Sequence, residues 1–92
     1  MLDRPALLDA LRANHSALTG CVRATRPDHH RLGRLMDERR LLLGSLASSA
    51  PSDAEINEVV AAQRDLEVEL ASASLRVHTR MREILGRSAL PN

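Results

Sequence analysis

Apolar residues recur at spacings of three and four in three stretches of the chain, the pattern of helices that bury one face. The first stretch predicts a helix from about residue 4 to 24. Its stripe consists of Leu7, Leu11, His15, Leu18, Val22 and Thr25, with one strongly polar member. Asp3 is placed to cap this helix, and Pro5 suits its first turn.

The second stretch predicts a helix over residues 27–47. Pro27 breaks the first helix, because proline cannot continue a helix interior but can begin one. The apolar stripe of this second helix consists of Leu32, Leu35, Met36, Leu42, Leu43 and Leu46. Residues 48–51 then form a loop that ends in proline.

The third stretch predicts the longest helix, over residues 53–86. Ser52 followed by Glu55 is the spacing of a capping box, and Gly86 is suited to end the helix. No glycine or proline interrupts the span between them, so we expect one unbroken rod. Its near-heptad stripe consists of Ile56, Val59, Gln63, Leu66, Leu70, Ala73, Val77, Met81 and Ile84. We expect Leu66, Leu70 and Val77 to be buried in the bundle or in a tight dimer.

These three patterns predict an all-α fold in one domain over residues 1–92. The helices would form an antiparallel three-helix bundle or hairpin with a long third helix, and residues 87–92 would be a tail. Because a chain of 92 residues supports only a small core, a second copy could complete the bundle by forming a dimer.

Composition narrows the range of functions. The chain has thirteen basic residues, all arginine, and a formal net charge of +1, which gives no general attraction to nucleic acid or membrane. Cys21 is the single cysteine, so no internal disulfide can form. No apolar run is long enough to cross a bilayer, and acidic residues interrupt the start of the chain where a secretory pattern would lie. We therefore expect a cytoplasmic location.

Candidate chemistry in the sequence is sparse. His29 and His30 are adjacent, so on a helix they point about 100° apart, and no histidine or carboxylate pair has the spacing of a metal loop. Arg39 and Gln63 lie inside apolar stripes, as polar residues do in small helical chorismate mutases that hold a dicarboxylate. An enzyme of that type is one alternative, but the chain has no lysine for such a site. We expect no catalytic activity, no cofactor and no metal.

A second apolar face on the third helix is the strongest functional indication. Val68 and Leu75 are seven residues apart and lie nearly opposite the main stripe. Ala71 extends this face, and Leu41 likewise points away from the stripe of the second helix. Because a helix that is apolar on two sides is usually covered on two sides, we predict that Leu41, Val68, Ala71 and Leu75 bind a protein partner.

Two segments resemble the FliT-type flagellar export chaperones. Residues 28–46, DHHRLGRLMDERRLLLGSL, are similar to the second helix of that family, with Leu-x-x-Leu, then Glu-Arg, then Leu-Leu-x-x-Leu. Residues 65–70, DLEVEL, resemble its third helix. The related FlgN-type and type III secretion chaperones share this style of sequence.

The resemblance implies a flagellar export chaperone. Such a protein binds the C-terminal helical segment of a flagellar subunit, typically the filament-cap protein, prevents premature assembly and docks to the export machinery. It implies no chemistry and no cofactor. The alternative from the residues alone is a helical-bundle protein that associates only with copies of itself.

Overall fold

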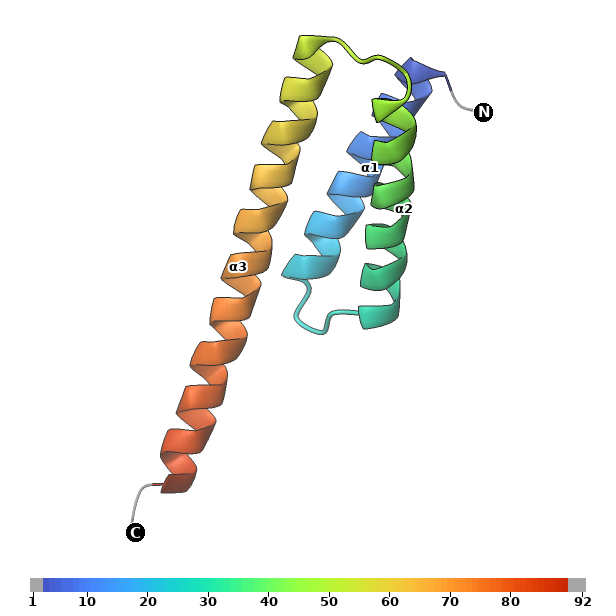
Figure 1. The fold of residues 1–92 in the computed structure, drawn as a ribbon. Coiled ribbons are helices and arrows are strands. Elements are labelled where there is room, and N and C mark those ends of the chain that lie inside the picture. The colour runs from blue at the N-terminus through green and yellow to red at the C-terminus, as the bar shows by residue number, and fades with distance from the viewer. Residues whose placement is uncertain (1–2, 90–92) are drawn as a thin grey trace.

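The computed structural model describes the backbone of residues 3–89 and the side chains of residues 3–86. It contains three helices, α1 (Arg4–Arg23), α2 (His29–Ala47) and α3 (Asp53–Ala89), and no strand within the described residues. Successive helices run in opposite directions, so α1 and α3 are parallel, and α3 continues well past the other two (Figure 1). The predicted all-α fold with three helices is confirmed.

Side chains at the helix starts explain where the helices begin. Asp3 accepts a hydrogen bond from the backbone N–H of Ala6 at 2.9 Å, so this cap is confirmed. The Ser52 hydroxyl accepts from the Glu55 N–H at 3.3 Å, and the Glu55 carboxylate accepts from the Ser52 N–H at 2.8 Å. These reciprocal bonds are the predicted capping box. In α2, however, Asp28 is the cap, and the helix begins at His29, two residues later than predicted.

The prediction that Gly86 ends the third helix is wrong. Helix α3 continues through Gly86 to Ala89, and no glycine in the described part of the chain has a positive φ. Glycine permits the left-handed conformation of a helix end but does not impose it. Residues 87–89 of the expected tail are therefore helical, and residues 90–92 lie outside the described residues.

The core is built around α1, which packs against both other helices. Seven of its residues are buried: Leu7, Leu8, Leu11, Asn14, Leu18, Cys21 and Val22. From α2 only Arg39 and Leu46 are buried, and from α3 only Leu66 among the side chains described. One cluster unites Leu8, Leu11 and Leu46, with Leu42, Leu43 and Val59 packed around it. The middle helix of the bundle is thus the first in the sequence.

Three ion pairs and one histidine–carboxylate contact hold α3 beside α1 in one register. They are Arg4–Glu55 at 3.2 Å, Arg12–Glu58 at 2.6 Å, His15–Asp65 at 2.9 Å and Arg23–Glu69. Each of these four α1 residues therefore contacts a residue 46 to 51 positions later in the chain. Since Arg23 is the last residue of α1, α1 stops beside Glu69.

The lengths of the helices decide which part of α3 is covered. Helix α1 has 20 residues and spans about 30 Å, whereas α3 has 37 residues and spans about 55 Å. Leu66 is fully buried, Leu70 is partly buried, and Val77 is 64% exposed. The predicted burial is confirmed for Leu66 but wrong for Val77 within one chain, because α1 and α2 end before reaching it.

Truncating Leu66 tests the packing of α3 on α1. We expect Leu66→Ala to lower the free energy of unfolding by about 2–5 kcal/mol, the range for a fully buried leucine. The matched control is Leu75→Ala, because Leu75 lies on the same helix but is exposed; its change should stay below about 0.5 kcal/mol. Urea unfolding followed by circular dichroism measures both, and equal losses would contradict the assigned packing.

Acid should weaken the contact between α1 and α3. Hydrogen bonds from Arg12 and Arg23 lower the pKa values of Glu58 and Glu69 below their ordinary range. A carboxylate with a lowered folded-state pKa stabilises the fold above its unfolded value of about 4.3. That contribution is lost as pH falls through the folded-state value.

We expect Glu58→Gln to reduce the loss of stability between neutral pH and pH 3, measured by urea unfolding at each pH. Glu38→Gln is the control, because Glu38 is exposed and forms no ion pair with the described residues. If both variants keep the full pH dependence, the Arg12–Glu58 pair does not contribute to it.

Candidate protein-binding surface

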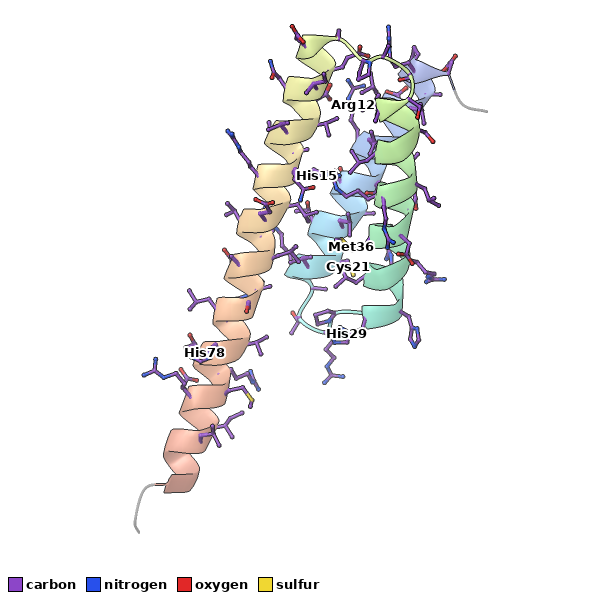
Figure 2. The ribbon with its side chains drawn as sticks, in the orientation of Figure 1. Arg12, His15, Cys21, His29, Met36 and His78 are labelled. Atoms are coloured by element: carbon purple, nitrogen blue, oxygen red, sulfur yellow. The ribbon has the colours of Figure 1, made fainter. Side chains whose placement is uncertain are left out.

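The last part of α3 carries the buried stripe of that helix into solvent. We call residues 74–86 the distal segment; every side chain in it is exposed. At 100° per residue, Val77 lies about 20° and Met81 about 60° around the helix from Leu66. These side chains therefore continue the face that α1 covers earlier in α3. Figure 2 shows the distal segment, marked by His78, extending beyond the loop that joins α1 to α2.

Large apolar side chains dominate this continuation. Val77, Met81, Ile84 and Leu85 are 64%, 53%, 48% and 61% exposed, respectively. We call these four residues the distal apolar face. Scattered exposed apolar residues are normal on a protein surface, but four within three turns of one helix form a continuous patch of the kind that marks an interaction site.

A groove lies where α3 separates from α1. Its walls are the end of α1 with the following loop on one side and the start of the distal segment on the other, and its volume is ≈ 670 Å³. It is lined by Val22, Arg23, Ala24, Thr25, Pro27, Ala73, Leu75, Arg76, Val77, Thr79, Arg80 and Glu83. Val77 belongs to both the groove and the distal apolar face, so the two surfaces are continuous.

The charge around this surface is mainly positive. Arg76, Arg80 and Arg82 lie in the distal segment, with Glu83 as its single acid. No carboxylate lies within 4.0 Å of these three guanidinium groups in the part of the chain whose side chains are described. In contrast, Arg23 at the other wall already pairs with Glu69. An approaching partner thus meets apolar side chains flanked by three arginines that form no salt bridge with the described residues.

The structure separates the four residues predicted as partner-binding. Leu41, Val68, Ala71 and Leu75 are all exposed. Val68, Ala71 and Leu75 lie on one side of α3, roughly opposite Leu66, and Leu75 also lines the groove. Leu41 lies in a different groove, of ≈ 680 Å³, between α2 and Leu7 of α1. The structure therefore gives no single surface that contains all four.

The heptad pattern of the sequence predicts burial for one residue of the distal apolar face, Val77. Val77, Met81 and Ile84 follow the heptad pattern of Leu66 and Leu70, and periodicity alone cannot tell a covered part of a stripe from an uncovered part. The signal that distinguishes them is helix length. A helix of 20 residues cannot cover one of more than 30 along its whole length.

Other candidate chemistry does not gather into a site. Within the described residues, no group of three or more histidine, cysteine, aspartate or glutamate side chains could hold a metal ion. His29 and His30 are exposed at the start of α2. Cys21 is buried, and its thiol lies 3.6 Å from the carbonyl oxygen of Asp28, across the turn between α1 and α2.

Neither a search for membrane-spanning helices nor the comparisons with known proteins add a further indication of function. None of the helices described here is both long enough and apolar enough to span a membrane. No family model, curated protein or solved structure matches the chain. The function is therefore inferred from the sequence and from the surfaces of this molecule alone.

Proposed function

We propose that this protein binds a helical segment of another protein along the distal apolar face and acts as a chaperone of the flagellar export type. The observation that carries the proposal is the apolar stripe of α3, which continues past the end of α1 and α2. A helix that stands alone in water gains nothing from such a stripe, whereas a partner helix packed on it would bury these side chains.

The shape of the surface favours a helix as the partner. Val77, Met81 and Ile84 follow one another at spacings of four and three along about 10 Å of α3. An amphipathic helix laid on this row can place its own apolar residues between them. The groove beside Val22 and Pro27 extends the apolar contact toward the end of α1.

The charges favour a different protein over a second copy of this chain. Two antiparallel copies could in principle set the basic distal segment of one against the acidic first half of α3 in the other. However, Glu55, Glu58 and Glu69 in that half already pair with arginines of α1. Two distal segments packed on each other would bring arginines together, which is unfavourable. An acidic amphipathic helix fits the surface better.

A chaperone role follows if the bound helix is one that the partner uses for its own assembly. While that helix lies on α3, it cannot pack against other subunits. The resemblance of residues 28–46 to flagellar export chaperones points to a flagellar subunit, such as the filament-cap protein, held in the cytoplasm before export. The proposal assigns the protein no catalytic step. Self-association remains the competing function.

A peptide titration tests this proposal. The peptide is the C-terminal helical segment of the filament-cap protein from the same genome, and isothermal calorimetry measures its affinity for the full chain. We expect the double change Val77→Ser and Met81→Ser to weaken binding about tenfold or more, because each substitution removes roughly 1 kcal/mol or more of apolar burial. The fold should persist, because both side chains are exposed in the free chain.

The control carries Leu41→Ser and Val68→Ser, two exposed apolar residues outside the groove. We expect its affinity to be unchanged. If only the control loses binding, the partner uses the surface predicted from sequence. If the peptide does not bind and sedimentation shows concentration-dependent association, the protein is a self-associating bundle and the chaperone proposal fails.

A further inference from the structure

Arg39 is a buried cation without an opposing carboxylate. It lies in the middle of α2 and is only 4% exposed. Its Nε and Nη2 atoms donate to the Gln63 Oε1 of α3 at 3.2 and 2.9 Å. No carboxylate lies within 4.0 Å of its guanidinium among the side chains described. Buried charges are normally paired, because removing a charge from water is costly.

In the surroundings of Arg39, the hydrogen bonds to the Gln63 amide oxygen offset only part of this cost. Burial lowers the pKa of Arg39, since desolvation disfavours the charged guanidinium. Gln63 supplies only the partial charge of an amide oxygen. Its own Nε2 donates to Glu67 at 3.4 Å, which keeps Oε1 turned toward Arg39.

A cavity of ≈ 280 Å³ opens beside Arg39, between the three helices. Its apolar lining comes from Leu8, Leu11, Val59 and Ala62, and its remaining lining from Arg12, His15, Ser16 and Glu58. The volume approaches the lower end of the range for small-molecule sites. The cavity therefore combines one unopposed buried cation with several apolar walls.

The other polar groups at the cavity, Arg12, Glu58 and His15, already have partners for most of their polar atoms. Arg12 donates to both carboxylate oxygens of Glu58, at 2.6 and 3.0 Å. His15 Nε2 lies 2.9 Å from an Asp65 oxygen, while its buried Nδ1 has no hydrogen-bond partner. Glu58 at the cavity and Asp65 beside it are acidic and would disfavour a ligand that carries two negative charges. The single positive charge of Arg39 therefore suits a ligand with one negative charge.

We propose that this cavity binds a small organic monocarboxylate, whose carboxylate accepts hydrogen bonds from Arg39 and whose apolar body lies against Leu8, Leu11 and Val59. Arginine matches a carboxylate because its N–H groups form a planar fork. The proposal is independent of partner binding on the distal apolar face, since the two surfaces share no residue.

Hexanoate is a suitable probe, with 1-hexanol and inorganic phosphate as controls at matched ionic strength. Two-dimensional NMR of the full chain would follow the methyl groups of Leu8, Leu11 and Val59 during each titration. We expect saturable shifts of these methyl groups with hexanoate. Hexanol should bind at least about tenfold more weakly, because it lacks the charge-assisted hydrogen bonds to Arg39. Phosphate should shift none of them.

The variant Arg39→Met removes the charge but retains a long side chain. We expect it to fold, because replacing a buried charge with an apolar group is often neutral or stabilising, and to bind hexanoate at least about tenfold more weakly. Arg40→Met is the matched control, because Arg40 is the next residue and its side chain is 78% exposed; it should bind hexanoate normally.

Three results would overturn the proposal: equal binding of hexanoate and hexanol, normal hexanoate binding by Arg39→Met, or shifts confined to methyl groups outside the cavity. If Arg39→Met does not fold, the comparison of hexanoate with hexanol on the unaltered chain decides the question alone.

Discussion

The parallel packing of α3 along α1 is the contact on which the rest of this structure depends. Leucines on both helices form its apolar part, and Leu18 and Leu66 are fully buried. Ion pairs of α1 arginines with α3 glutamates, from Arg4–Glu55 at one end to Arg23–Glu69 at the other, fix the register of this contact. This register sets the point at which α1 stops beside α3. Beyond that point α3 keeps the same apolar pattern, and its side chains from residue 74 to 86 are exposed.

The consequence is an elongated molecule in which the other two helices cover only the first part of α3. Its extents are 64 × 24 × 16 Å, and its radius of gyration of 17.6 Å exceeds the value of about 12 Å for a compact chain of this length. A short helix alone in water is only marginally stable. A partner packed on the distal apolar face would therefore both bury apolar surface and hold the distal segment in its helical form, which supports partner binding as the function of this part.

The features that the sequence predicts correctly are those that depend on residues a few positions apart in the chain. The cap at Asp3 and the box of Ser52 and Glu55 are short-range hydrogen bonds, and both are present. Burial was less predictable. Val77 fits the core stripe as well as Leu66 does, yet its exposure depends on how far another helix reaches. Arg39 and Gln63 stood out as polar residues in apolar stripes, but their contact and the cavity beside them require the relative placement of α2 and α3.

Amide hydrogen exchange along α3 in the dilute, partner-free chain tests the central claim most directly. The account predicts strong protection for residues 59–70, where α1 covers the helix, and exchange at least about tenfold faster for residues 77–85, whose side chains are exposed. Adding the partner peptide should then slow exchange in the distal segment. Uniform protection along α3 in the free monomer would contradict the account, because it would show that the distal segment is stable without a partner.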